Sequence, residues 1–316
     1  MKINAYQWRQ IQIYAVQQLG FMDVSIAKAG LMEPEARRLE AWLNQGHHAK
    51  MSYLENHFDL RVDPRKLVEG AKSVISLSYN YYNDQVEQPA DAPKIAMYAY
   101  GKDYHKLIRK KLKHLLDWIE ESMGEVNGRG FVDSAPILER DWARRSGMGW
   151  IGKHTLLISK RRGSYFFLAE LISDLEYEDD IHIESDHCGT CTRCIDACPT
   201  DAISPAGYVL DATKCISYLT IELKESMPEE YQDQLESWMF GCDICQQVCP
   251  WNRFSSNHNE PKFLPSTSLM SKNRKDWQDL EEPEFELLFA GSAVRRAGFL
   301  KLKDNIEAVI RSDSEE

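Results

Sequence analysis

The sequence predicts an α+β fold in three parts: an N-terminal α/β domain (residues 1–179), a small cysteine-rich module (180–255) and a short helical C-terminal segment (256–316). Three observations lead to this prediction. Segments with helical and strand-like periodicity alternate through the first part. All eight cysteines lie in the second part. Helical periodicity returns after a polar stretch in the third part.

The first part opens with a helix over residues 4–19, which Gly20 ends, and continues into a strand at 21–26. A second helix is predicted at 34–44 because Pro34 suits the first turn of a helix. The polar stretch at 47–67 has little periodicity, so we expect a loop with short helices.

Two strands are predicted next, at 73–82 and 94–100, because both segments are rich in β-branched and aromatic residues. Residues 104–123 then form a strongly amphipathic helix whose opposite face is basic. Its apolar face consists of Leu107, Ile108, Leu112, Leu115, Leu116 and Ile119.

The first part ends with a short strand at 130–133, a helix at 137–146 and a hairpin. The hairpin would join residues 155–159 to residues 164–173 through a tight turn. From about Asp180 we expect no strands. Helical segments are predicted at 216–238, between cysteines, and at 284–289 and 292–310.

Composition indicates an ordinary globular protein, with 316 residues of which 43% are hydrophobic. No apolar run is long enough to cross a membrane, and the N-terminus lacks the apolar stretch of a signal peptide. We therefore expect a cytoplasmic, monomeric protein whose cysteines bind metal rather than form disulfides. The net charge of −11 means that a nucleic-acid partner would need a local basic patch.

The cysteine spacing is typical of a ferredoxin-like module with two [4Fe–4S] clusters. The first motif is C-x2-C-x2-C-x3-C-P, and in this pattern the fourth cysteine serves the other cluster. The second motif is stretched by an insertion but keeps its final Cys-Pro. The predicted ligands are therefore Cys188, Cys191, Cys194 and Cys249 for cluster one, and Cys198, Cys215, Cys242 and Cys245 for cluster two.

Two structural zinc sites with four cysteines each are the alternative, since paired C-x2-C units also bind zinc. Two clusters in line would pass electrons to a third redox centre, and the large first part would hold it. The run GMGWIG at residues 147–152 matches G-x-G-x-x-G in spacing, but it follows a predicted helix rather than a strand, so a Rossmann-bound nicotinamide or flavin has no support.

Five segments in order resemble the epoxyqueuosine reductase family over roughly residues 1 to 300. They are YAYGKDYHKLIRKKL, FVDSAPILERDWARRSGMGWIGKHTLLIS, CGTCTRCIDACPTDAI, KCISYLTIEL and FGCDICQQVCPWNRF. The resemblance implies a cobalamin-dependent oxidoreductase of queuosine biosynthesis. Its clusters, fed by an external low-potential electron donor, would supply electrons to reduce epoxyqueuosine in tRNA to queuosine, the epoxide becoming an alkene.

In this family Asp133 aligns with the proton donor, and Tyr104 and His105 are further candidates for catalytic hydrogen bonds. A carboxylic acid suits this role if burial raises its pKa towards neutrality. Without the resemblance, Asp133 would also suit a turn or a helix N-cap, although the end of a strand is a common place for chemistry. Without the resemblance, Tyr104 and His105 would simply be exposed residues at the beginning of the predicted helix.

The resemblance also implies residues that line cobalamin. Besides Asp133 they are Lys153, His154, Leu157, Leu168, Ser217 and Asp243. Because Ser217 and Asp243 flank ligands of cluster two, we expect that cluster to lie nearer cobalamin. Without the resemblance, Lys153 and His154 would more often be ordinary surface residues.

For tRNA contacts, the basic run RRAGFLKLK is the strongest candidate, with Arg295, Arg296, Lys301 and Lys303. Such a run is usually a solvated face. Three other functions remain open from the sequence: a reductive dehalogenase-like cobalamin enzyme, an iron–sulfur electron carrier, and a protein that reduces the corrinoid of another protein.

Overall fold

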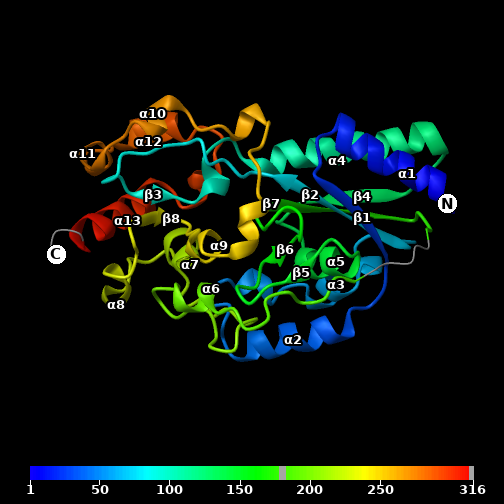
Figure 1. The fold of residues 1–316 in the computed structure, drawn as a ribbon, viewed down its shortest axis with the longest axis horizontal. Helices are drawn as coiled ribbons and strands as arrows, with labels where there is room; N and C mark the ends of the chain where they lie inside the picture. The colour runs from blue at the N-terminus through cyan, green and yellow to red at the C-terminus, as the bar shows by residue number, and fades with distance from the viewer. Residues whose placement is uncertain (178–182, 313–316) are drawn as a thin grey trace.

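The computed structural model describes residues 1–177 and 183–312, so the predicted boundary at residues 179 and 180 lies outside the described residues. An antiparallel sheet with strand order β1-β2-β7-β4 organises the N-terminal part (Figure 1). Its strands are β1 Asp23–Lys28, β2 Ser73–Asn80, β4 Gly128–Phe131 and β7 Phe166–Ser173. The mixture of this sheet with helices confirms the predicted α+β class.

Helices α1 (Ala5–Ile13) and α4 (Tyr104–Met123) cover one face of the sheet (Figure 1). A capping box begins α1, in which Asn4 and Gln7 exchange side-chain to backbone hydrogen bonds, and a π-helical turn at Tyr14–Gln18 extends it. The predicted apolar face of α4 is confirmed, because its residues pack with the sheet in one core. The fully buried members are Ile108, Leu112, Leu115 and Ile119.

Helix α5 (Glu139–Arg145) packs against the other face, next to a small ladder of β5 (Trp150–Ile151) and β6 (Leu157–Ile158). Helix α2 (Glu33–Asn44) is tied to α5 through Glu35. The carboxylate of Glu35 is 2% exposed and accepts hydrogen bonds from Arg144 at 2.9 Å and Arg145 at 2.7 Å. Because a buried carboxylate needs such partners, this contact fixes α5 in position.

Two predicted strand arrangements are wrong. The predicted strand at 94–100 is reduced to β3 (Lys94–Ile95), which a 3-10 turn at Met97–Ala99 follows. Only the turn of the predicted hairpin forms, with an isolated antiparallel bridge between Ser159 and Gly163, because β6 pairs with β5 while β7 pairs with β2 and β4. Strand β7 has eight mostly buried residues, and the two-residue β6 could not cover them.

A second core joins distant parts of the chain. Strand β3 pairs in parallel with β8 (Trp238–Phe240), so the prediction that strands end before the cysteines is wrong. Buried residues of segments 92–99, 212–240 and 269–309 share this core, at the left of Figure 1. Its helices are α7 Ile216–Ile221, α8 Glu229–Gln232, α10 Thr267–Met270, α11 Arg274–Gln278, α12 Glu282–Leu288 and α13 Phe299–Ser312.

The remaining short helices are α3 Phe58–Val62, α6 Arg193–Asp196 and α9 Ile244–Gln247. The predicted helix at 292–310 is divided, since a 3-10 turn at Ala293–Arg296 precedes α13 and Gly298 adopts a φ of +83° between them. Within the described ranges, none of the helices has the length and apolar character needed to cross a membrane.

Candidate active site

Asp133 lies two residues beyond β4, at the centre of a tight turn. The backbone N–H of Ser134 donates to the carbonyl of Val132 at 2.6 Å, and the φ of Asp133 is +53°. A γ-turn with positive φ is a strained conformation for a residue that carries a side chain. Two contacts hold the turn: the Asp133 N–H donates to Glu139 Oε1 at 2.6 Å, and Arg109 donates to the Ser134 hydroxyl at 2.6 Å.

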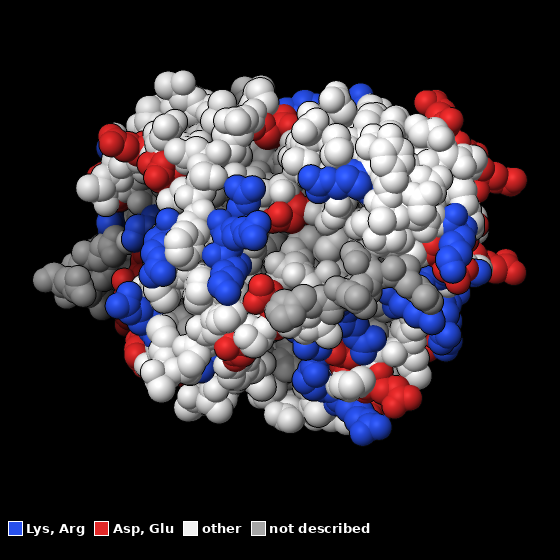
Figure 2. Space-filling view, turned by 45° about the vertical axis from the view of Figure 1, so that its right-hand side comes forward, with Lys and Arg blue, Asp and Glu red and all other residues white. Residues whose placement is uncertain are grey.

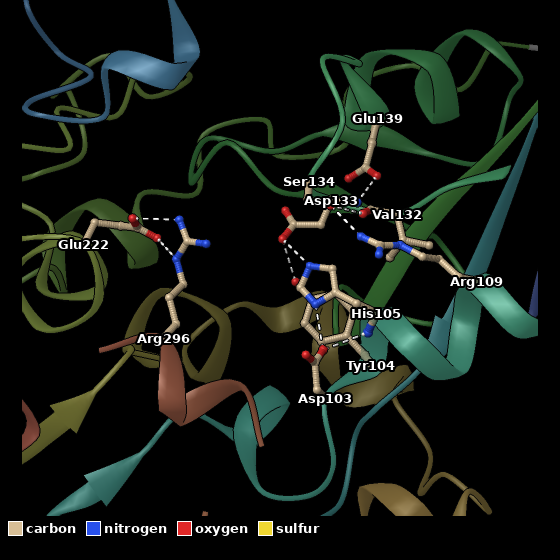
Figure 3. Close-up of polar contacts among 10 residues, drawn as sticks. All are labelled: Asp103, Tyr104, His105, Arg109, Val132, Asp133, Ser134, Glu139, Glu222 and Arg296. Atoms are coloured by element: carbon tan, nitrogen blue, oxygen red, sulfur yellow. Dashed lines mark hydrogen bonds and ion pairs between the residues drawn. The ribbon is translucent and has the colours of Figure 1, made fainter. Parts of the chain in front are cut away.

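The first residues of α4 point towards Asp133 (Figure 3). The hydroxyl of Tyr104 donates to Asp133 Oδ2 at 2.9 Å, and His105 Nε2 lies 3.0 Å from the same oxygen. On its other side, His105 Nδ1 lies 2.6 Å from Asp103 Oδ1, which also caps α4 by accepting the His105 backbone N–H at 2.9 Å. The three predicted catalytic residues are therefore brought together.

The backbone that leads into α4 needs glycine at position 101. A Cβ atom there would lie 2.3 Å from the carbonyl oxygen of Lys262 and 2.5 Å from Phe263 Cα. Tyr104 is then fixed by stacking on Phe167 of β7, with ring centroids 3.9 Å apart and an interplanar angle of 12°. The sheet thus positions the hydroxyl that faces Asp133.

The expected rise in the pKa of Asp133 is not found. Burial acts to raise it, but the hydrogen bonds from His105 and Tyr104, and the charges of His105 and Arg296, outweigh burial and lower the pKa. For His105, burial acts to lower the pKa, and the hydrogen bonds to Asp133 and Asp103 together raise it. Both shifts favour the pair of a protonated His105 imidazole with an ionised Asp133 carboxylate.

Arg296 faces Asp133 from the opposite side of the site (Figure 3). Its Nε and Nη2 donate to the two carboxylate oxygens of Glu222 at 2.6 and 2.9 Å. The ring of Tyr98 packs edge-on against Tyr104, with centroids 6.3 Å apart, and burial and then the charges of Asp133, Asp243 and Glu222 raise its pKa. Polar groups from four separate segments, at residues 103–109, 132–139, 222 and 296, therefore lie in one region (Figure 3).

All eight cysteines are free, and their neighbours fall into two sets. Burial, followed by Cys249, Cys188 and Cys191, raises the pKa of the Cys194 thiol to about 11. The predicted four ligands of cluster one are therefore close together.

The other four cysteines, Cys198, Cys215, Cys242 and Cys245, form the second set. Burial, with Cys215 and Cys198 among the charged neighbours, raises the pKa of the Cys242 thiol to about 12. Burial and then Cys242 and Cys215 raise that of Cys245. Two sets of four thiols are the donor set that two cubane clusters require.

Two family models match this chain. One described as "Epoxyqueuosine reductase QueG, DUF1730" covers residues 61–134, which include Tyr104, His105 and Asp133. The other, a "4Fe-4S double cluster binding domain", covers residues 187–252 and includes all eight cysteines. This match confirms the prediction of two [4Fe–4S] clusters and argues against the zinc alternative.

The epoxyqueuosine reductase of Cellulophaga algicola is 54% identical to this chain over 290 residues, which are 92% of this chain and 94% of that protein. This chain belongs to the epoxyqueuosine reductase family. The structure of the Streptococcus thermophilus epoxyqueuosine reductase aligns with a TM-score of 0.87 at 29% identity, covering 96% of this chain and 81% of that one. A crystal structure of an epoxyqueuosine reductase with a tRNA-Tyr epoxyqueuosine-modified stem loop aligns with a TM-score of 0.84 at 29% identity. The alignment covers 97% of this chain and 82% of that one.

Apart from Asp133, the residues that the epoxyqueuosine reductase family suggests for cobalamin fall in three places. Asp243 is 5% exposed and accepts the Met97 N–H at 2.7 Å, and hydrogen bonds from Ser217 act on the Cys215 thiol, so both lie at the second cysteine set. Leu157 and Leu168 pack in a small core beside α5.

Lys153 and His154 lie at the first cysteine set instead. Lys153 Nζ donates to the carbonyls of Gly189 and Cys191 at 2.8 and 2.9 Å. Burial lowers the pKa of His154 to about 4, and both residues line a cavity of about 50 Å³ with the four cysteines of that set. Lys153 therefore stabilises the loop that carries the first cysteine set, and His154 lies beside the same cysteines.

The four residues suggested for tRNA contact differ in their surroundings. Arg295 is 47% exposed and pairs with Glu286 at 2.5 Å, and Arg296 faces Asp133 as described. Lys301 has a side chain only 5% exposed and donates to the Glu225 carbonyl at 3.0 Å. Lys303 donates to the carbonyls of Gln278 and Leu280.

Sequence reasoning missed Asp103, Glu139, Glu222 and the place of Arg296 beside Asp133. Asp103 could have been found, because an aspartate directly before an amphipathic helix is a typical N-cap. Glu139 carries no such signal, since acidic residues are common in the first turn of any helix.

Proposed function

We propose that this chain reduces epoxyqueuosine in tRNA to queuosine, with cobalamin fed by two [4Fe–4S] clusters. The observation that carries the proposal is the group of Asp133, Tyr104 and His105, found in a chain that is 54% identical to a named epoxyqueuosine reductase over nearly its whole length. The conversion of an epoxide to an alkene consumes two electrons and two protons and releases water.

The proton-handling residues are the chain's own contribution to the reaction. His105 would hold a proton between Asp103 and Asp133 and release it through Asp133 towards the departing oxygen. Tyr104 would orient the Asp133 carboxylate by its hydrogen bond. Such positioned proton transfer typically contributes about 10²–10⁴-fold in rate.

The electron path would lead from the clusters, which the cysteines would hold, to a cobalamin near Tyr98. Cys188, Cys191, Cys194 and Cys249 would hold cluster one, and Cys198, Cys215, Cys242 and Cys245 cluster two. The polar groups around Tyr98 suit the amide side chains of a corrin, and Asp133, Ser217 and Asp243 would face it. Cobalamin would supply a low-valent cobalt that delivers the electrons to the epoxide.

The partners follow from the same proposal. The tRNA would approach the Arg296 side, where Arg295 is also exposed. Figure 2 shows basic side chains in short rows, with acidic ones among them, so contact with tRNA would rely on local patches. We further propose an external low-potential electron donor, a cytoplasmic location and a monomer.

Turnover of epoxyqueuosine-containing tRNA tests the function. The chain, purified without oxygen, should carry about eight iron atoms and should form queuosine when cobalamin and a low-potential reductant are added. Omitting either additive is the matched control. A chain that is loaded with iron and cobalamin but forms no queuosine would contradict the proposal.

A further inference from the structure

Glu139 lies directly behind the strained turn of Asp133. Its Oε1 accepts the Asp133 backbone N–H at 2.6 Å, a short bond for this kind of donor. Figure 3 shows the Glu139 carboxylate on the far side of the turn from Tyr104 and His105. The turn is therefore held from both sides.

Glu139 itself stands on a rigid element. It is the first residue of α5, whose last turn is fixed by the two arginines that bind buried Glu35. Trp142 in the same helix is 1% exposed and packs in the core under the sheet. A helix held in this way can keep an acceptor at a fixed place beneath the Asp133 turn.

A second carboxyl group lies next to Glu139 in the interior. Glu170 of β7 is 0% exposed, and neither of its carboxyl oxygens has a hydrogen-bond partner within normal geometry among the described residues. It stands opposite Ser76 of β2, whose hydroxyl also has none. An isolated ionised carboxylate in such a place is very costly, so Glu170 is a neutral acid.

The electrostatics of the pair agree with this reading. Burial, followed by the charge of Glu139, raises the pKa of Glu170 well above its ordinary value. Burial and the charge of Asp133 raise the pKa of Glu139 to about 7, while the Asp133 N–H and Arg140 act to lower it. Burial therefore favours the protonated form of Glu170.

We propose that Glu139 is a positioning residue that holds the strained Asp133 turn in its left-handed conformation, and that fully buried Glu170 is a neutral acid. This inference rests on the proposed function, because it assigns the turn a role in proton delivery. An ordinary first-turn glutamate, by contrast, would contribute only to the stability of α5.

Turnover of Glu139 variants tests the first half of the inference. Glu139→Ala removes the acceptor and should lower kcat by about 10–100-fold with little change in KM, because small displacements of a catalytic group have effects of this size. Glu139→Gln keeps an oxygen acceptor and should stay within about fivefold of the wild type. Exposed Glu121 of α4 provides the control, and Glu121→Ala should retain full turnover.

Hydrogen exchange gives a readout that does not depend on activity. Amides of the segment around Asp133 should exchange at least about tenfold faster in Glu139→Ala than in the wild type or Glu139→Gln. Unchanged exchange, or turnover of Glu139→Ala within about twofold of the wild type, overturns the role of Glu139. If the wild type and Glu121→Ala also fail to turn over, it is the proposed function that has failed.

Glu170→Gln tests the second half, because an amide resembles the neutral acid. The folded protein keeps the Glu170 proton above the pH at which the unfolded chain loses it, so Glu170 costs stability as pH rises. The Tm of Glu170→Gln relative to wild type should therefore increase from about pH 5.5 to about pH 9. A relative Tm that stays constant or decreases would show that Glu170 is ionised and would overturn its assignment.

Discussion

His105 and Asp133 meet through one pair of atoms, Nε2 and Oδ2, 3.0 Å apart, while the other ring nitrogen of His105 meets Asp103 at 2.6 Å. An imidazole between two carboxylates is stabilised in its protonated form, which is why its pKa is raised. The proton donor that we propose is therefore a group of three residues, His105, Asp133 and Asp103, rather than a single aspartic acid.

Asp103→Asn tests this arrangement through pH dependence. Asparagine caps a helix as well as aspartate does, so α4 should be retained while one negative charge beside His105 is lost. The pKa of His105 should fall, and because the rate declines as His105 loses its proton, the alkaline decline should begin at lower pH than in the wild type. Single-turnover rates across pH measure this, and an unshifted profile would show that His105 does not control the rate.

Asp133→Asn should keep both clusters and lose most product formation. An amide cannot pass a proton to the epoxide oxygen, so we expect a decrease of about 10²–10⁴-fold in the single-turnover rate. Iron content and the cluster absorption bands serve as controls for folding. Turnover close to that of the wild type would remove Asp133 from the reaction.

The crossed arrangement of cysteines predicts an unequal result for two double variants. Cys188→Ser with Cys249→Ser should remove ligands of one cluster only and leave about four iron atoms, whereas Cys188→Ser with Cys242→Ser should leave almost none. Iron analysis of chains purified without oxygen distinguishes the cases. If each cluster used one motif alone, both double variants would lose all their iron.

Arg295 and Lys301 should affect tRNA binding differently. Arg295→Gln removes an exposed charge and should reduce the slope of log affinity against log salt by about 0.7–0.9. Lys301→Gln replaces a buried side chain and should lower the Tm while leaving that slope unchanged. Binding of a tRNA stem loop at several salt concentrations measures both, and equal slopes for Arg295→Gln and the wild type would exclude Arg295 from the interface.

Gly101→Ala should destabilise the protein, because its new Cβ would lie 2.3 Å from the Lys262 carbonyl oxygen. Overpacking of this kind typically costs about 1–3 kcal/mol. Gly30→Ala is the matched control, since no atom lies within 4 Å of a Cβ at that position. Thermal unfolding of both variants measures the difference, and equal Tm values would show that the chain adjusts at Gly101 without cost.

Local patterns predicted the features that depend on local physics. The helix at Tyr104–Met123 follows from its apolar periodicity, and the cluster ligands follow from the requirements of a cubane. Strand partners could not be predicted, because the register of β7 depends on β2 and β4, which lie far away in the sequence. The sign of the Asp133 pKa shift depends in part on Arg296, which lies more than a hundred positions further along the chain.

The hydrogen bond from the Met97 N–H to Asp243 connects the cysteine-rich part of the chain to the first domain. Asp243 stands between two ligands of one cysteine set, and it holds the backbone that leads from β3 towards α4. This hydrogen bond therefore ties the segment that precedes Tyr104 and His105 to the loop that carries Cys242 and Cys245. A displacement of that loop would be transmitted through the backbone to the beginning of α4.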